Sequence, residues 1–124
     1  MKMTKIEIIT RSSKLEELKD ALNAIGVHGM TVSQVYGCGL QKGHKEIYRG
    51  REYDVNLVPG IKVETVVCEI PVELVIETAQ KILRTGKFGD GKIFISELSD
   101  AVRIRTGQRG VEAIMDIPGE KPAR

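Results

Sequence analysis

Residues 61–98 read IKVETVVCEIPVELVIETAQKILRTGKFGDGKIFISEL and contain a strand, a helix and a second strand in succession. Apolar and polar residues alternate over part of Ile61–Cys68, which is typical of a strand. After it, apolar residues recur every three or four positions up to Gly86, which predicts an amphipathic helix. Lys92–Leu98 predicts a further strand, in which Ile93-Phe94-Ile95 favours burial on both faces.

The N-terminal half predicts three more elements. Isoleucines make Lys5–Thr10 a short strand. Ser13 and Glu16 have the spacing of a capping box, so a helix should begin at Ser13, and Gly26 suits the left-handed residue that ends it. Met30–Tyr36 predicts a strand. The order is therefore βαββαβ, which indicates an α+β fold.

The predicted helices are too few to cover both faces of a four-stranded sheet. Apolar residues such as Phe94 on the second face therefore predict that subunits pack sheet to sheet. We expect a homo-oligomer.

The length of 124 residues is that of one domain, which we place at residues 1–115, with a loosely ordered tail at 116–124. A net charge of +2 is too small to favour direct nucleic-acid binding. No apolar run is long enough for membrane insertion and no signal-peptide pattern precedes the first strand, which predicts a cytoplasmic protein. The cysteines and histidines lack ligand spacing, so we expect no metal held by the protein alone.

The segment Cys38–Pro59 joins the second and third strands through about twenty residues without periodicity, whereas such connections usually have ~4–6. Long loops of this kind are usually functional. This one carries basic residues and tyrosines suited to contact with another protein, namely Tyr48, Arg49, Arg51 and Tyr53. A solvated flap without a partner is the alternative interpretation.

Thr85–Lys92 is the strongest candidate for a phosphate-binding loop. Its glycines allow successive backbone N–H groups to converge on phosphate oxygens, and Lys92 adds a charge. It is not a P-loop, because Ile93 replaces the magnesium-binding hydroxyl and the glycines lead into a strand rather than a helix. A plain helix end followed by a tight turn is the alternative.

Two further segments favour the phosphate interpretation. Arg103 and Arg105 lie two residues apart, so in an extended segment both can point at one phosphate chain. Gly37–Gly43 adds glycines at a strand end, where the backbone can approach a ligand closely.

Nothing in the sequence has the pattern of catalytic machinery, so we do not expect an enzyme. A phosphotransfer enzyme on the same βαββαβ order is a distant alternative, and it would need His28 or His44 as phosphate acceptor. An RNA recognition module is disfavoured because the strands Lys5–Thr10 and Ile61–Cys68 contain no aromatic residue.

Taken together, three motifs resemble the PII family of nitrogen-regulatory signalling proteins, over residues 5–115. They are Tyr48-Arg49-Gly50-Arg51-Glu52-Tyr53, Thr85–Lys92 with Ile93-Phe94, and Arg103-Ile104-Arg105-Thr106-Gly107. The stretch Gly37-Cys38-Gly39-Leu40-Gln41-Lys42 is most similar to the versions in Gram-positive bacteria.

The resemblance implies a ferredoxin-like sandwich assembled as a homotrimer, with ATP or ADP bound in the three clefts between subunits. Cys38–Pro59 would be the T-loop, which docks on a target such as an ammonium transporter, another membrane transporter or a transcriptional regulator. Thr85–Lys92 would hold the phosphates, with magnesium accompanying ATP. Arg103 and Arg105 would reach in from the neighbouring subunit.

By position, the residues implied in nucleotide binding are Thr31, Gly37, Gly39, Glu64, Val66, Gly89, Asp90, Gly91, Lys92, Arg103 and Arg105. Thr31, Glu64 and Val66 would surround the base, and the others would line the ribose and phosphates. Gln41 and Gly43 are implied in binding magnesium and 2-oxoglutarate. Tyr53 resembles the tyrosine that carries a uridylyl group in family members that are modified.

Three residues depart from the family's pattern. Gly60 stands where a basic residue usually pairs with 2-oxoglutarate, and loss of such a contact costs ~1.5–3 kcal/mol. Leu40 replaces an Arg that reaches the terminal phosphate, and Arg51 occupies a usually small position beside Tyr53. We therefore expect a regulator that binds ATP or ADP with 2-oxoglutarate sensing weakened or lost. The alternative is a PII regulator that senses 2-oxoglutarate with Mg-ATP and controls an ammonium transporter or nitrogen enzymes.

Overall fold

A computed structural model describes residues 2–38, 45–48, 51–54 and 57–115. The elements in chain order are β1 (Thr4–Thr10), η1 (Ser12–Lys14), α1 (Leu15–Ala24), β2 (Thr31–Cys38), β3 (Lys45–Tyr48), β4 (Arg51–Asp54), β5 (Leu57–Val67), α2 (Val72–Leu83), β6 (Lys92–Glu97) and α3 (Val111–Ile114). The predicted βαββαβ order is present, with a hairpin added between β2 and β5.

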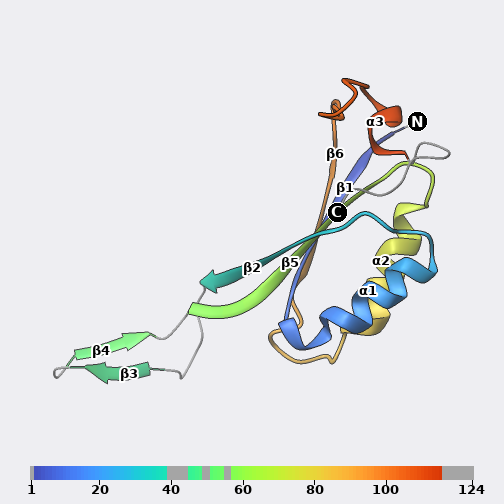
Figure 1. Ribbon diagram of the computed structural model, residues 1–124. Helices are drawn as coiled ribbons and strands as arrows, with labels where there is room; N and C mark the ends of the chain where they lie inside the picture. Colours follow the sequence, from blue (N-terminus) through green and yellow to red (C-terminus); the bar gives the residue numbers. More distant parts are fainter. Residues whose placement is uncertain (1, 39–44, 49–50, 55–56, 116–124) are drawn as a thin grey trace.

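Four strands form an antiparallel sheet in the order β2-β5-β1-β6. Helices α1 and α2 lie together on one face of it, as Figure 1 shows. This arrangement confirms the predicted α+β sandwich with ferredoxin-like strand order. The other face of the sheet is not covered by any helix that the structure describes.

The core lies between the sheet and these two helices. Alternate residues of the central strands, including Ile6, Ile8 and Val63, point toward the helices and are almost fully buried. Leu22 of α1 and Val75 of α2 meet them and are likewise buried. The alternate apolar side chains of the strands and the apolar face of each helix therefore pack together in one core.

The predicted capping box at Ser13 is wrong, although the end of the helix is confirmed. Ser13 lies inside the 3-10 turn η1, and α1 begins at Leu15 without a side-chain cap. The turn supplies a backbone bond instead, from the Lys14 N–H to the Arg11 carbonyl. At the other end Gly26 has φ of 100°, as a left-handed cap residue requires.

Helix α2 ends at Leu83, three residues before the predicted end at Gly86. Arg84 is extended, with φ of −70° and ψ of 123°. The N–H groups of Thr85 and Gly86 donate to a side chain in the following loop rather than to helix carbonyls. A competing acceptor, which the apolar period cannot show, therefore ends the helix early.

The connection Cys38–Pro59 contains more regular structure than its sequence predicts. Strands β3 and β4 pair as an antiparallel hairpin, and β5 already begins at Leu57. Pro59 thus lies within a strand, opposite Tyr36 of β2. Strand β1 pairs with β5 only from Ile61 onward, so Pro59 has a neighbouring strand on one side, where proline is tolerated. Figure 1 shows β2 and β5 running on beyond the end of β1.

Strand β6 leaves apolar surface exposed on a single chain. Ile93 packs against the core, whereas Phe94 and Ile95 are 51% and 49% exposed. The prediction that subunits pack through this sheet remains a prediction.

Two properties of the described ranges bear on function. None of their helices has the length and apolar character needed to cross a membrane. Nor do these ranges bring together three or more His, Cys, Asp or Glu side chains that could hold a metal ion.

We expect Leu22→Ala to lower the free energy of unfolding by about 2–5 kcal/mol, because it empties a fully buried position between α1 and the sheet. Urea unfolding followed by circular dichroism measures this loss. Leu74→Ala is the matched control, since Leu74 lies on α2 but is 39% exposed. Equal losses in the two variants would contradict the assignment of the core.

Candidate functional site

The loop between α2 and β6 is organised around its own carboxylate, Asp90. Its Oδ2 accepts hydrogen bonds from the backbone N–H groups of Thr85 and Gly86, at 2.8 and 2.9 Å. Its Oδ1 accepts from the Thr85 hydroxyl at 2.5 Å and from the Arg11 guanidinium at 2.9 Å. The Thr10 hydroxyl donates to the Asp90 backbone carbonyl at 2.8 Å. The loop is thus tied both to itself and to the end of β1.

The backbone N–H groups of Thr85 and Gly86, at the start of the predicted phosphate loop, bind Asp90. The hydrogen bond from the Thr85 hydroxyl, together with the two N–H groups and the nearby Arg11 guanidinium, lowers the pKa of the Asp90 carboxyl. Asp90 is therefore ionised at neutral pH. This part of the loop has the geometry of an anion site, and the anion in it comes from the protein.

Gly91 places the loop directly against β1. Its φ is 102°, in the left-handed region. A Cβ at this position would lie 1.8 Å from the Ile9 carbonyl oxygen and 3.0 Å from Thr10 Cα. Only glycine fits there without moving the backbone of one strand.

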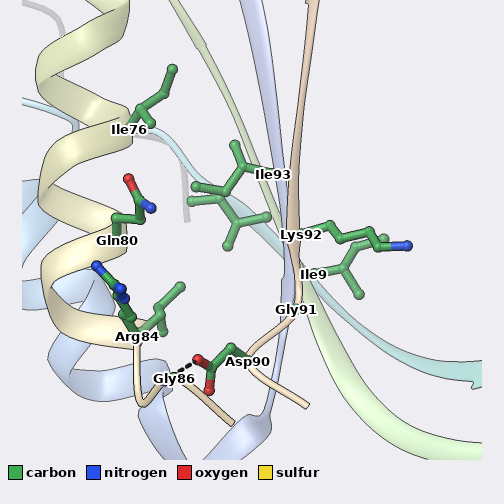
Figure 2. A pocket seen from close by; sticks show the side chains of 11 residues that line it. Ile9, Ile76, Gln80, Arg84, Gly86, Asp90, Gly91, Lys92 and Ile93 are labelled. Atoms are coloured by element: carbon green, nitrogen blue, oxygen red, sulfur yellow. Dashed lines mark hydrogen bonds between the residues drawn. The ribbon is translucent and has the colours of Figure 1, made fainter. Parts of the chain in front are cut away.

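Two hollows flank the loop. The first, of about 380 Å³, lies between α2 and β6, with Ile76 and Ile93 among its apolar walls (Figure 2). The second, of about 490 Å³, is lined by loop residues 87–92 together with Ile9 and Phe94. The loop therefore offers surface to both sides of β6.

The residues predicted to surround a base lie on the uncovered face of the sheet. Thr31 of β2 is paired with Glu64 of β5, and Val66 follows two positions along the same strand. The structure thus brings these three positions together.

Glu64 belongs to a charge network on that face. Its carboxylate lies 3.0 Å from Lys62 Nζ and 3.6 Å from Lys5 Nζ, and Lys5 is 2.9 Å from Glu7. The hydrogen bond from Lys62, with the charge of Lys5, lowers the pKa of Glu64. The hydrogen bond to Glu7 and the charge of Glu64 raise the pKa of Lys5. Glu64 and Lys5 are therefore charged at neutral pH.

The prediction of an extended segment around Arg103 and Arg105 is wrong. Residues 104–106 form a turn, closed by a 2.7 Å bond from the Gly107 N–H to the Arg103 carbonyl. Val102 and Arg109 are bridged on either side of it. The left-handed φ of 74° at Gly107 permits this reversal.

The Arg103 side chain folds back onto the C-terminal residues. Its guanidinium donates to the carbonyls of Glu112 and Ala113, both at 3.3 Å, and to the Met115 carbonyl. Arg103 therefore caps the end of the short helix α3 in this chain.

A second carboxylate, Asp100, holds the base of the same turn. It accepts hydrogen bonds from the Arg109 guanidinium and from the N–H groups of Ala101 and Gly110. The turn is thus presented from a fixed base, and the Ile104 side chain at its apex is 98% exposed.

The two basic halves of the predicted phosphate site lie at opposite ends of the sheet. Lys92 is opposite Ile9 near the end of β1, whereas Leu98 is bonded to the Met3 carbonyl at its beginning. The strand Lys92–Glu97 alone separates them by about 17 Å, at ~3.4 Å per residue. Figure 1 shows α2's loop and the segment after β6 at these opposite ends.

The remaining predicted residues are placed as follows. Gly37 lies on β2, at the opposite edge of the sheet from Lys92, which is about 14 Å across three strand spacings. Lys92 is level with Ser33 of β2, so Gly37 is also four residues further along that strand. Tyr48, Arg51 and Tyr53 lie in the hairpin β3–β4, whose backbone alone is described. Outside the described residues are Gly39, Leu40, Gln41, Gly43, Arg49 and the tail 116–124.

Arg11 is a site residue that sequence reasoning missed. It follows β1 and meets Asp90 from 79 positions away along the chain. Lys5, Lys62, Asp100 and Arg109 were missed for the same reason. Their only sequence signal is a charge in or beside a strand, which does not identify its partner.

Comparison with known proteins gives consistent relationships. The family model described as "Nitrogen regulatory protein P-II" matches residues 3–108. The "Nitrogen regulatory PII-like protein" of Bacillus subtilis is 50% identical over 112 residues, which cover 90% of this chain and 97% of that protein. The "Nitrogen regulatory protein P-II 2" of Methanothermobacter thermautotrophicus is 52% identical with the same coverage of both chains.

Solved structures agree with the sequence relationships. B. subtilis GlnK superposes with a TM-score of 0.77 at 49% identity, covering 91% of this chain and 99% of that one. The B. subtilis GlnK-ATP complex gives a TM-score of 0.75 at 46% identity, covering 90% and 95%. Arabidopsis thaliana PII bound to citrate gives 0.71 at 39%, covering 90% and 92%.

We expect Asp90→Asn to lower the melting temperature at neutral pH, because it removes the charge that Arg11 and the loop amides stabilise. Since the folded pKa lies below the usual 3.8, that stabilisation is present above 3.8 and is lost as pH falls through the folded pKa. The difference in melting temperature between wild type and variant should therefore be constant above about pH 5 and shrink below it.

Asp20→Asn on the exposed surface of α1 is the control for loss of one charge. It should leave the melting temperature nearly unchanged. If the melting temperatures of wild type and Asp90→Asn differ by the same amount at every pH from 7 down to acid unfolding, the assigned role of the Asp90 carboxylate is contradicted.

Proposed function

The chain belongs to the nitrogen regulatory protein P-II family, and on that premise we propose that it is a signalling protein that binds ATP or ADP between the subunits of a homotrimer. Through the segment 38–59 it would signal to target proteins which nucleotide is bound. The solved complex of B. subtilis GlnK with ATP supports the choice of ligand.

The separation of the two basic halves of the site carries the proposal. The loop 85–92 and the 103–107 turn lie too far apart to hold one phosphate chain within a single subunit. A closed ring of identical chains brings one end of each sheet against the other end of its neighbour. The site is then complete only where two chains meet, so nucleotide and assembly are linked.

The residue roles follow from the positions. Thr31, Glu64 and Val66 would hold the base, and their grouping on the uncovered face favours a base bound beside that face. The residues that would hold ribose and phosphates are Gly37, Gly39, Gly89, Gly91, Lys92, Arg103 and Arg105. Gln41 and Gly43 would assist with magnesium. Arg103 would first have to leave the carbonyls that it binds in the single chain.

The trimer itself is favoured by the uncovered face of the sheet. Phe94 exposes about half of its surface on that face, and Ile95, on the helix side of the same edge strand, exposes about half of its own. Burying them against other subunits contributes roughly 25 cal/mol per Å² of apolar area.

The hairpin β3–β4 is the proposed target-binding element. It is reached through β2 and β5, which run beyond the rest of the sheet (Figure 1). The partner would be a membrane transporter, for ammonium or another substrate, or a transcriptional regulator, and the protein would act in the cytoplasm without catalysis. Tyr53 in β4 would be the position for modification.

We expect Lys92→Ala and Arg105→Ala each to weaken ATP binding, and mixtures of the two to regain it. Each single change removes a charge-assisted contact and should weaken affinity roughly 10- to 100-fold. In trimers reassembled from equal amounts of both variants, roughly a quarter of the clefts combine an intact Lys92 with an intact Arg105 from different chains. Calorimetric titration should detect this quarter at wild-type affinity. If no fraction of the clefts in the mixed trimers regains wild-type affinity for ATP, the idea of a cleft shared between subunits is contradicted.

Gly60 has a structural reason to lack a side chain. A Cβ there would lie 2.7 Å from the Thr10 carbonyl oxygen, so a side chain requires the backbone at the end of β1 to move. The close approach of the Thr10 carbonyl supports the proposal that position 60 carries no basic side chain to pair with 2-oxoglutarate. Arabidopsis PII bound to citrate represents the family members that hold a polycarboxylate.

In the presence of magnesium and saturating ATP, we expect 2-oxoglutarate to bind at least ten times more weakly than the micromolar range, because one ionic contact is missing. Calorimetry with the full chain measures this affinity. Micromolar binding would instead establish the alternative, a regulator that senses 2-oxoglutarate with Mg-ATP.

A further inference from the structure

Asp90 presents an electrostatic problem for a loop that holds phosphates. A carboxylate within a phosphate site repels the ligand, since both carry negative charge. The structure shows two features that remove this conflict: the direction of the carboxylate and the position of Arg11.

The Asp90 carboxylate is directed away from the side on which a phosphate would meet Lys92. Figure 2 shows it turned toward Gly86, on the α2 side of β6. The same view shows Lys92 extending to the opposite side, together with Ile9. The reversal occurs at Gly91, whose left-handed φ breaks the alternation of the strand.

Arg11 compensates the charge of Asp90. Its guanidinium is 2.9 Å from Oδ1, and both side chains are largely shielded, with 33% and 23% exposed. Thr85 completes the arrangement, because its hydroxyl donates to Oδ1 and accepts the Lys87 N–H at 3.2 Å. The carboxylate, the hydroxyl and the guanidinium thus fix the first half of the loop from within.

We infer that Arg11, Thr85 and Asp90 are positioning residues for nucleotide binding: they hold the loop so that residues 87–89 and Lys92 face the phosphates, and Asp90 does not contact the ligand. The inference rests on the proposed function, because it assigns roles around the same nucleotide. It moves Asp90 from the predicted ligand contacts to the support of the loop, and it adds Arg11, which lies outside the loop.

Arg11 also connects the loop to β1. The hydroxyl of the neighbouring Thr10 donates to the Asp90 backbone carbonyl, and the Thr10 backbone carbonyl lies beside Gly60. The loop, the end of β1 and Gly60 of β5 therefore form one continuous contact region. Phosphates bound to the loop would act on this region through Arg11.

Thr85 provides the first test, since valine has the same shape without the hydroxyl. We expect Thr85→Val to weaken ATP binding roughly tenfold, and Thr85→Ser to stay within about threefold of wild type, because serine keeps both hydrogen bonds. Adenosine, which lacks phosphates, should bind wild type and both variants equally. A change in adenosine affinity would indicate a general structural defect and would overturn the assigned role.

Arg11 provides the second test, because its replacement leaves Asp90 uncompensated. Arg11→Gln should weaken ATP binding, more at low than at high ionic strength, since salt screens the uncompensated charge of Asp90. Adding Asp90→Asn to Arg11→Gln should recover part of the affinity, because it removes the repelling charge. If Asp90 contacts the nucleotide, the double variant instead binds no better than Arg11→Gln, and the inference fails.

Wild-type protein separates this inference from the proposed function. If wild type fails to bind ATP, both are overturned. If wild type binds ATP and Thr85→Val binds it equally well, only the positioning network is overturned.

Discussion

One-sided packing of the sheet is the constraint on which the rest of this structure depends. Two helices bury one face of β2-β5-β1-β6, and the second face retains a charge network around Glu64 together with exposed Phe94. The positions predicted to surround a base lie on this second face, and the two basic segments lie at its two ends. Within one chain these segments are therefore kept apart. For the proposed nucleotide site, association of chains would be a requirement and not an addition.

The loop before β6 shows how a short segment becomes rigid without a helix or strand of its own. An aspartate accepts hydrogen bonds from the amides that follow α2, a threonine hydroxyl joins two parts of the loop, and the arginine directly after β1 neutralises the charge. The remaining N–H groups and Lys92 are then held in place before a ligand arrives. Such preorganisation lowers the ordering entropy that binding would otherwise cost.

The sequence predicts best where local geometry and pattern agree. The order of elements, the isoleucines of β1 and the left-handed Gly26 were all confirmed, because each depends on side-chain period or backbone sterics within a few residues. The failures were at Ser13, Gly86 and Arg103, where a backbone turn or an acceptor side chain in the adjoining loop overrides the local preference. The site follows the same division. The glycine loop was identified from its composition, whereas Arg11 could not be, since a contact across 79 positions exists only in three dimensions.

The contact at Gly60 decides which residues position 60 can carry. The end of β1 occupies the space that a side chain would need, because a Cβ at this position would lie 2.7 Å from the Thr10 carbonyl oxygen. A lysine or arginine there would therefore strain β1, and with it the loop that Thr10 supports. A cation at position 60 requires a coordinated change in the backbone of β1, so one substitution is not enough to introduce it.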